Sequence, residues 1–552
     1  MLKKNRIFYF LILFFLYNAV SAQVGYVPVN DEIYMFLERM QTLNIIEDYN
    51  SFEIPKTRSE IKTYLVQITK NINKLDKIDK KKLNDFVSEF EYDLFGSINN
   101  SVSFFNELNP GYIISNKEKY LYSYTDSNKA NIFINALGML NYLTKNSSGY
   151  KSNAFLYRFG GEIRGSLFNR LGFYAKTTNG SYSGSKQLAQ SFGSLKYNYK
   201  INNPTGSEIG DNFFDETEAF LTLDYNYVKL KIGNDRKIIG HGAHKIFLSN
   251  NAPRMEYVEF DLNYKSLSFS YIQGKILGLL TKPNSPVFDK YFVYHRLQYN
   301  PSKHFNLGLG EMLIYANRNI DFSYLNPFNF YKSSEHLNQD RDNSYLFLDF
   351  QNNSIKAFKF YSTFLIDDID FGKIGTGWYG NKTVMNFGVY SSIFYNYLPL
   401  DFELQYLKIE PYVFAHRLEK NNFTSLTYNL GTSFQPNTSA GIIKIYYRPF
   451  YRVNMSLAFT YAVHGANKYD KDGKLVTNYG GNILQGFRIG DSQKVFLLDG
   501  EKEIIREISL TTTYEPKRDI ILSLNANFLN NKLAASQKRE ELFFNLALYL
   551  KF

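Results

Sequence analysis

Cysteine is absent from this chain of 552 residues. Its absence excludes disulfide bonds, thiolate metal ligands and attachment of a lipid to an N-terminal cysteine. Tryptophan occurs once, whereas 46 tyrosines and 49 phenylalanines raise the aromatic content to 17%. Stability must therefore come from burial of apolar side chains and from backbone hydrogen bonds.

Long apolar runs are also scarce. One follows the basic residues Lys3, Lys4 and Arg6, covers residues 7–16 and gives way to small residues that end at Ala22. That order predicts a secretory signal peptide over residues 1–22. A retained membrane anchor is the alternative, but the run is shorter than the roughly 20 residues that a membrane span needs.

The remaining chain has no second run of that kind, which disfavours a bundle of membrane helices. Its mean hydropathy of −0.32 is unremarkable for an exported protein, although its aromatic content is high for a soluble one. An export signal, many aromatic residues and average hydropathy together are typical of a transmembrane β-barrel.

Residues 23–110 have the apolar spacing of short amphipathic helices. Asn30 is a candidate N-cap for the first helix, and Thr57 with Glu60 has the spacing of a capping box for the second. The charged residues 73–82 are expected to connect the second helix to a third. We predict a small α-helical bundle in the periplasm, and nothing in it suggests chemistry.

Residues 111–552 change to a period of two, which is the side-chain period of a β-strand. The last ten residues, FFNLALYLKF, place Leu546 and its alternate neighbours on one face and Asn545 on the other. A second stretch of this kind has Phe155, Tyr157, Phe159 and Ile163 on one face and Arg158, Glu162 and Arg164 on the other. The pattern predicts a mainly β fold, a transmembrane antiparallel β-barrel of about 18 strands that is closed by the last one.

The connections between the predicted strands differ in length. Tyr299, Tyr447 and Tyr514 each precede a tight polar turn, whereas residues 181–214 and 464–482 form long polar stretches. Short turns on one side, long loops on the other and aromatic residues at strand ends are typical of outer-membrane barrels. We therefore expect the long loops to be extracellular.

A dense polar stretch over residues 232–260 is the first candidate for function. Arginine side chains can pair with acidic groups of a polysaccharide, and asparagine amides can bind its hydroxyl groups. The candidate polysaccharide-binding residues in this stretch are Asp235, Arg236, His244, Asn250, Asn251 and Arg254. His241 and His244 are also a candidate metal pair, but no cysteine or suitably spaced carboxylate accompanies them, so we predict no metal site.

The second candidate stretch is FSYLNPFNFYKSSEHLNQDRDNSYLFLDF, residues 322–350. Its candidate residues are Asn326, Glu335, Asp342 and Asn343, and the aromatic residues around them can cover the apolar side of a sugar ring. A loop that folds into the lumen and satisfies its own backbone is an equal alternative. Serine, histidine and aspartate are present for a hydrolytic triad, but no spacing selects one set.

Four blocks in order resemble the Wzi family of capsule assembly proteins. The mature start YVPVNDEIYMFLERMQTLNII and the segment PKTRSEIKTYL are similar to the helices that open that family. GNDRKIIGHGAHKIFLSNNAP resembles its glycine-rich block that ends in Ser-Asn-Asn-Ala-Pro. YLNPFNFYKSSEHLNQDRDNSYLFLDF resembles its Asn-Pro, Glu and Asp-Asn block.

The resemblance implies an outer-membrane protein that attaches capsular or related polysaccharide to the cell surface without catalysis. Its partners would be that polysaccharide, outer-membrane lipid and, as a further candidate, polysaccharide export machinery. We predict no cofactor and no nucleic-acid partner; the net charge of +11 is compatible with an acidic glycan or with a solvated lysine-rich surface. An uptake porin and an outer-membrane enzyme are the alternatives.

Overall fold

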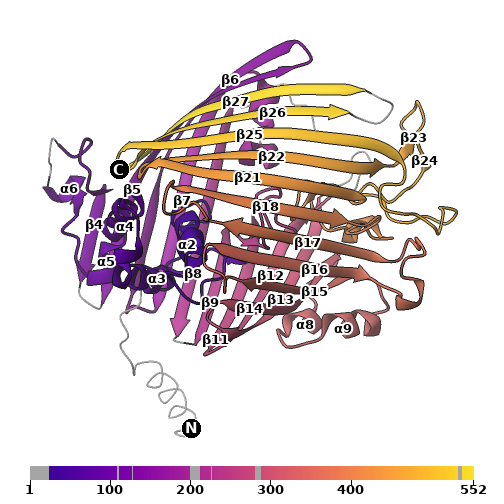
Figure 1. The fold of residues 1–552 in the computed structure, drawn as a ribbon, viewed down its shortest axis with the longest axis horizontal. Helices are drawn as coiled ribbons and strands as arrows, with labels where there is room; N and C mark the ends of the chain where they lie inside the picture. Colours follow the sequence, from indigo (N-terminus) through magenta and orange to yellow (C-terminus); the bar gives the residue numbers. More distant parts are fainter. Residues whose placement is uncertain are drawn as a thin grey trace, which may run out of the picture.

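The structure is a computed structural model that describes residues 24–107, 111–126, 129–198, 212–225, 227–279, 287–532 and 537–552. Within these residues, eighteen strands follow one another around a closed antiparallel barrel (Figure 1). The predicted signal peptide lies outside them. In chain order the barrel strands are β5 (Ala130–Ser147), β6 (Tyr150–Leu167), β7 (Leu171–Gly184), β8 (Phe213–Tyr225), β9 (Val228–Asp235), β11 (Met255–Tyr264), β12 (Leu267–Gly278), β13 (Phe288–Ser302), β14 (Phe305–Ala316), β15 (Asn343–Asn352), β16 (Phe358–Asp368), β17 (Lys382–Ser391), β18 (Leu400–Ile409), β21 (Thr438–Phe450), β22 (Val453–Ala466), β25 (Glu501–Lys517), β26 (Ile520–Lys532) and β27 (Lys538–Lys551).

The barrel closes where the last strand meets the first long one. Strand β27 pairs with β5 from Glu541 opposite Ser147 to Lys551 opposite Leu137. The short strand β4 (Tyr122–Asp126) pairs with the first residues of β5, along the same edge that β27 uses further on. The two strands therefore share one position in the barrel, and the prediction of about 18 strands closed by the last one is confirmed.

Side chains alternate between the two faces of the wall, as the sequence predicts. On β6, Phe159 is 59% exposed on the outer face, whereas Arg158 points inward and pairs with Glu216 at 3.2 Å. On β27, Leu546 is 56% exposed outside, whereas Asn545 accepts a hydrogen bond from Asn141 in the lumen. An apolar outer face and a polar inner one are what a barrel in a membrane needs.

The two ends of the barrel differ. Tight turns join β6 to β7, β11 to β12, β13 to β14, β21 to β22 and β25 to β26 at what we call the short-turn end. The exposed rings of Tyr299, Tyr447 and Tyr514 lie beside three of these turns. The opposite, long-loop end carries the connections from β9 to β11, β14 to β15, β16 to β17, β18 to β21 and β22 to β25.

The longer helical elements that the structure describes before the barrel are α2 (Ile33–Thr42), α3 (Arg58–Lys70), α4 (Lys77–Glu89) and α5 (Glu91–Phe95). The capping box of Thr57 and Glu60 is confirmed. Asn30 was wrongly predicted as an N-cap, because α2 begins later and the Asp31 carboxylate accepts the amide proton of Ile33. Residues 73–82 are not only a connector, since Asp76 caps α4 within them and most of the charged run is helical.

No helix among the described residues is long and apolar enough to cross a membrane. The smaller elements are β1 (Glu53–Ile54), η1 (Ile72–Lys74), β2 (Ser101–Ser103), α6 (Phe104–Glu107), β3 (Glu118–Tyr120), α7 (Lys186–Gln190), η2 (Gly193–Tyr197), β10 (Ile238–Ile239), α8 (Phe322–Leu325), α9 (Tyr331–Leu337), η3 (Phe371–Lys373), η4 (Glu419–Asn421), β19 (Thr424–Ser425), β20 (Tyr428–Asn429), β23 (Lys468–Tyr469) and β24 (Leu475–Thr477).

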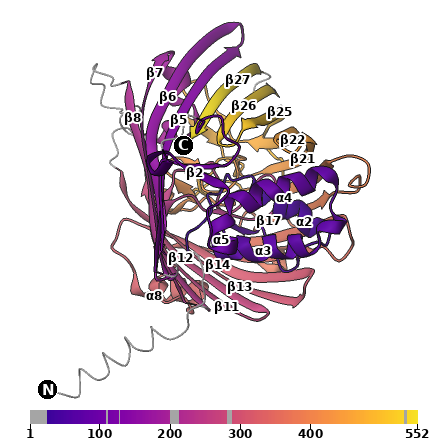
Figure 2. The same ribbon diagram turned by 90° about the vertical axis from the view of Figure 1, so that its left-hand side faces the viewer.

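The helices lie across the short-turn end of the barrel (Figure 2). Arg39 of α2, which has no exposed surface, donates to Asp79 of α4 at 2.9 Å and forms an ion pair with Asp401 of β18. Further ion pairs between the helical part and the barrel or its turns are Glu38 with Lys359, Glu60 with Lys229, Asp85 with Arg452 and Glu89 with Arg518. Charged pairs from several strands thus hold the helices in place.

A packed apolar core occupies the lumen on the side formed by β11 to β22. Strand β1, which precedes α3, enters the lumen and pairs there with β10. Beside it, Phe52 lies 5.7 Å from the ring of Phe247, and both rings are fully buried. The side formed by β25 and β26 instead carries partly exposed polar groups such as Asn525. A second, smaller apolar cluster lies on the inner face of β5 to β8, so the lumen combines packed apolar parts with a polar wall along β25 and β26.

Candidate functional site

The connection from β9 to β11 folds into the lumen and brings only part of the first predicted set together. Asp235 accepts hydrogen bonds from Lys231 at 2.7 Å and from the Tyr257 hydroxyl at 2.5 Å. Asn251 donates to the carbonyl oxygens of Asn429 and Thr432. Asp235 thus fixes the connection to the barrel wall, and Asn251 fixes it to the connection from β18 to β21. Both side chains are engaged within the protein.

Arg236 and Asn250 line a cavity of about 170 Å³ between the N-terminal segment and strands β7 to β9. Arg254 lies close by and donates to Glu218, another residue of that cavity wall, at 2.7 Å. Burial and the neighbouring Arg254 lower the pKa of Arg236. Arg236 and Asn250 therefore face a cavity inside the barrel and not the surface of the long-loop end, and Arg254 is engaged with Glu218 of the cavity wall.

The two histidines of this loop have different surroundings. His241 is buried between the rings of Phe52 and Tyr361, whereas His244 stacks on Phe434 at 4.7 Å. Burial lowers the pKa of both imidazoles. Among the residues that the structure describes, no group of three or more histidine, aspartate and glutamate side chains is placed to hold a metal ion.

The second predicted set lies along the connection from β14 to β15. Asp342 accepts two hydrogen bonds from Arg318, at 2.7 and 2.6 Å, and Glu335 accepts one from Lys332 at 3.0 Å. Asn343 donates to the Tyr345 hydroxyl and to a backbone carbonyl, and Asn326 accepts the amide proton of Phe328. All four side chains take part in contacts that shape this connection.

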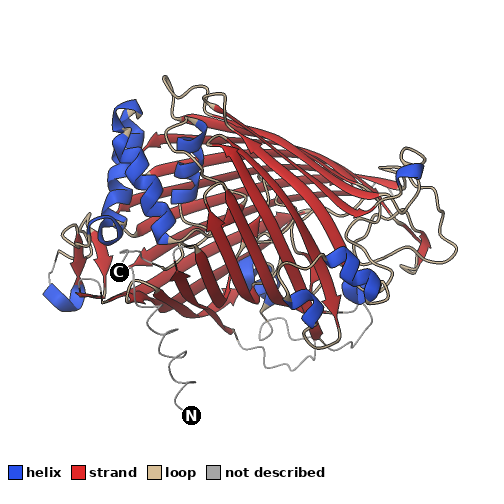
Figure 3. Ribbon diagram, turned by 90° about the horizontal axis from the view of Figure 1, so that it is seen from below, coloured by secondary structure: helices blue, strands red, loops and turns tan. Residues whose placement is uncertain are grey.

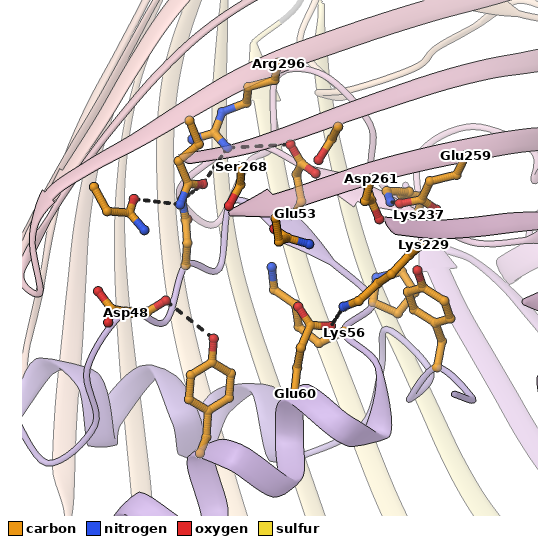
Figure 4. A pocket seen from close by; sticks show the side chains of 18 of the residues that line it. Asp48, Glu53, Lys56, Glu60, Lys229, Lys237, Glu259, Asp261, Ser268 and Arg296 are labelled. Carbon is orange, nitrogen blue, oxygen red and sulfur yellow. Dashed lines mark hydrogen bonds and ion pairs between the residues drawn. The ribbon is translucent and has the colours of Figure 1, made fainter. Parts of the chain in front are cut away.

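A polar cavity of about 230 Å³ lies at the short-turn end, between α3 and the inner wall of β9 to β13 (Figure 4). Its charged lining consists of Lys56, Lys229, Lys237, Lys265 and Arg296 and of Asp48, Glu53, Glu60, Glu259 and Asp261. Positive and negative groups are equal in number, so the cavity has no surplus charge with which to select an ionic ligand.

Several of those charges are also paired across the cavity. Lys229 donates to Glu60 at 3.0 Å, and Lys237 forms an ion pair with Glu259. Burial alone would raise the pKa of Glu60, but Lys229, Lys56 and the capping amide of Thr57 hold it at about 2. The cavity lies at a charged interface between the helical part and the barrel, far from the long-loop end.

The long-loop end carries a cluster that sequence reasoning missed. The connection from β16 to β17 holds Trp378, the one tryptophan of the chain, and pairs through its backbone with Lys494 of the connection from β22 to β25. The ammonium group of Lys373 lies 4.0 Å from the centre of the Trp378 ring. We call the cluster of Lys373, Trp378, Tyr379, Phe487, Lys494 and Phe496 the aromatic platform.

Part of the aromatic platform is closely packed, and part of it is exposed. Tyr379 stacks on Phe487 with their ring centres 3.7 Å apart, which ties the two connections together. Phe496 is 46% exposed, and Lys373 and Lys494 lie over aromatic rings. Aromatic faces cover the apolar side of a sugar ring, and ammonium groups pair with acidic substituents. The arrangement is suited to an acidic or neutral glycan chain at the surface.

Close packing explains the glycines of this loop. A side chain at Gly377, where φ is +76°, would meet the Phe496 ring, and one at Gly380 would meet the Trp378 ring. A single tryptophan in the glycine-rich run FGKIGTGWYGN was the signal in the sequence. It gives no partner by itself, because the facing residues come from a loop more than a hundred positions later.

No family model matches the sequence, and no curated protein matches it. Solved structures do match. Wzi of Escherichia coli, described as an outer membrane protein involved in group 1 capsule assembly and as a carbohydrate-binding β-barrel, aligns with a TM-score of 0.57. The alignment covers 96% of this chain and 99% of that one, at 11% sequence identity. The chain has the fold of Wzi.

Two other matches are outer-membrane proteins of Pseudomonas aeruginosa. OpdK, solved with vanillate, aligns over 76% of this chain and 99% of its own with a TM-score of 0.45 and 11% identity. OccK8 (OprE) aligns over 76% and 98% with a TM-score of 0.46 and 11% identity. These scores support no argument about this chain. The likeness to Wzi extends over the helical part as well as the barrel, and it concerns the fold.

Proposed function

We propose that this chain is an outer-membrane protein that attaches capsular or related polysaccharide to the cell surface as a lectin-like anchor, without catalysis. The signal peptide would be removed after residue 22, residues 23–110 would lie in the periplasm, and the barrel of residues 111–552 would span the membrane. The apolar outer wall supports the membrane location, because strands with such faces need lipid around them.

The aromatic platform is the observation that carries the proposal. It lies at the long-loop end, which is extracellular in an outer-membrane barrel with short periplasmic turns. The partly exposed rings of Trp378 and Phe496 offer apolar surface to sugars, and Lys373 and Lys494, which lie over these rings, offer positive charge. The fold of a carbohydrate-binding barrel is compatible with this role but does not specify it at 11% identity.

Polysaccharide retention tests the proposal in cells that lack the gene and carry plasmid-borne variants. We expect Trp378→Ala to move polysaccharide from the cells to the medium while total polysaccharide stays constant. Loss of one aromatic stacking partner weakens binding by about threefold to tenfold. The purified variant should show the same weakening toward isolated polysaccharide.

Tyr150→Ala is the matched control, because Tyr150 is an aromatic residue that is 85% exposed at the tip of the hairpin between β5 and β6. It should leave retention unchanged. Equal retention by the Trp378→Ala variant, with the barrel inserted normally, would remove the platform from the proposal. Shortened polysaccharide after incubation with the purified protein would favour an enzyme instead.

A further inference from the structure

The segment from β14 to β15 lies outside the barrel. Its helices α8 and α9 pack against the outer wall of β12 to β15, near the long-loop end (Figures 1 and 3). On the outer face of β12, Leu267 is 45% exposed, whereas Tyr271 is almost fully covered. The cover consists of Tyr324 of α8 and Tyr331 of α9, which are buried in the same cluster as Tyr271.

Two polar residues of the outer wall, Glu311 and His295, contact α9. Glu311 of β14 points outward and accepts the first amide protons of α9, from Tyr331 at 2.8 Å and from Lys332 at 3.2 Å. His295 of β13 lies 3.1 Å from Glu311, and its ring stacks on Tyr331. A carboxylate on the outer face of a membrane barrel is unfavourable unless it is paired and covered. The helices provide that cover.

The exposed face of the segment is rich in large apolar side chains. These are Ile320, Phe322, Leu325, Phe328, Phe330 and Leu337, and the polar residues Asn326, Ser333 and His336 are exposed among them. Phe328 also stacks on Phe269 of the outer wall, with ring centres 5.0 Å apart. The apolar surface of the barrel therefore continues without a break onto the segment. An apolar surface of this extent in water is a liability for a soluble loop.

The position along the wall also suits a membrane boundary. Val293, in the covered cluster, lies nine residues before Ser302, where β13 reaches the short-turn end. With a rise of ~3.3 Å per residue and a strand tilt of ~40°, the covered cluster stands roughly 23 Å above that end. The apolar band of an outer-membrane barrel is about 25 Å tall. The helices therefore lie near the outer boundary of the apolar band, at the interface of the outer leaflet with water.

We propose that residues 320–338 form an interfacial segment whose apolar face binds the acyl chains of outer-leaflet lipid. The segment is thus part of the membrane boundary of the barrel and not an extracellular glycan site. Glu335 then fastens α9 to Ser344 of β15, and Asp342, next to the start of β15, fastens α8 by accepting a hydrogen bond from the Tyr324 hydroxyl. The proposal rests on the proposed outer-membrane location.

The absence of cysteine allows a direct test. Single cysteines are introduced as Phe328→Cys and Leu337→Cys, labelled with a nitroxide, and studied by electron paramagnetic resonance in reconstituted bilayers. Collisions with oxygen report contact with lipid, and collisions with a neutral, water-soluble nickel chelate report contact with water. Leu309→Cys, in the middle of the exposed outer face of β14, is the lipid control, and Phe371→Cys, in the connection from β16 to β17, is the water control.

We expect both test sites to favour oxygen over the nickel chelate, as the Leu309 site does. Nickel contact as strong as at the Phe371 site would overturn the inference and leave the membrane location intact. Low collision rates with both reagents would also overturn it, because a second copy or another protein would then cover the face. Nickel contact at the Leu309 site would instead remove the membrane location itself.

Discussion

Arg39 has no exposed surface, and its guanidinium group faces carboxylates from both parts of the molecule. It donates to Asp79 of α4 and to Asp76, which caps α4, and pairs with Asp401 of β18. We expect Arg39→Ala to weaken the attachment of the helices by about 3–5 kcal/mol, since it leaves buried carboxylates without their partner. The rate of limited chymotrypsin cleavage within the helical part measures this in the folded protein, because neither this substitution nor its control changes a chymotrypsin site.

Lys70→Ala is the control, because Lys70 is an exposed cation at the end of α3. Surface changes of this kind stay within about 0.5 kcal/mol. Asp401→Asn should reproduce part of the effect from the barrel side. If Arg39→Ala and Lys70→Ala were digested at the same rate, apolar packing and not the buried charge would hold the helices.

Strand β27 shows the difference between the two faces of the wall clearly. Leu546 is exposed outside, and Asn545 is buried inside. We expect Leu546→Arg to destabilise the barrel by about 2–4 kcal/mol in lipid, the range for a charge near the middle of a bilayer. Urea-dependent folding into vesicles measures the loss. Thr511→Arg, on the partly exposed inner face of β25, is the control and should cost much less.

A similar loss for both substitutions would contradict the assignment of faces. A loss for Thr511→Arg alone would reverse it. Either result would also question the membrane location, because only lipid makes an exposed charge at residue 546 so unfavourable.

Strand patterning was predictable because it is local. The alternation of β6 and β27, the tyrosines beside the short turns and the capping box of Thr57 all depend on residues close together in the chain. The strand number followed from the spacing of these patterns. The start of α4 was missed because two of its buried positions, Asp79 and Lys82, carry charged side chains, so the apolar period of the helix begins only at Leu83.

The site was less predictable because long connections fold back against distant strands. Nothing in residues 232–260 shows that they enter the lumen and pair with β1, some 185 positions earlier. Likewise, residues 322–337 have the composition of a sugar-binding loop but pack on the outer wall. Trp378 went unnoticed because its neighbours Phe487 and Lys494 lie in another loop.

At the scale of the whole molecule, the packed core of the lumen limits the passage of solutes through the barrel. An open barrel of 16–18 strands leaves a water-filled channel, but here the side formed by β11 to β22 is filled and the helices lie across the short-turn end. We expect planar-bilayer currents far below those of an open porin. Phe52→Ala should raise these currents, because loss of the buried ring leaves a cavity in the core and destabilises it by about 3–5 kcal/mol.

Phe371→Ala, at an exposed loop position, should leave the current unchanged. A large steady current from the unmodified protein would mean that the polar side along β25 and β26 is a through-path. The uptake-channel hypothesis would then be favoured.

The packed lumen has a consequence for the cell as a whole. Large solutes cross an outer membrane through wide porins, and each open channel adds to the leak across that membrane. A barrel that is packed from β11 to β22 adds little to that leak. In the role proposed above, a cell can therefore raise the copy number of this anchor without making its outer membrane more permeable.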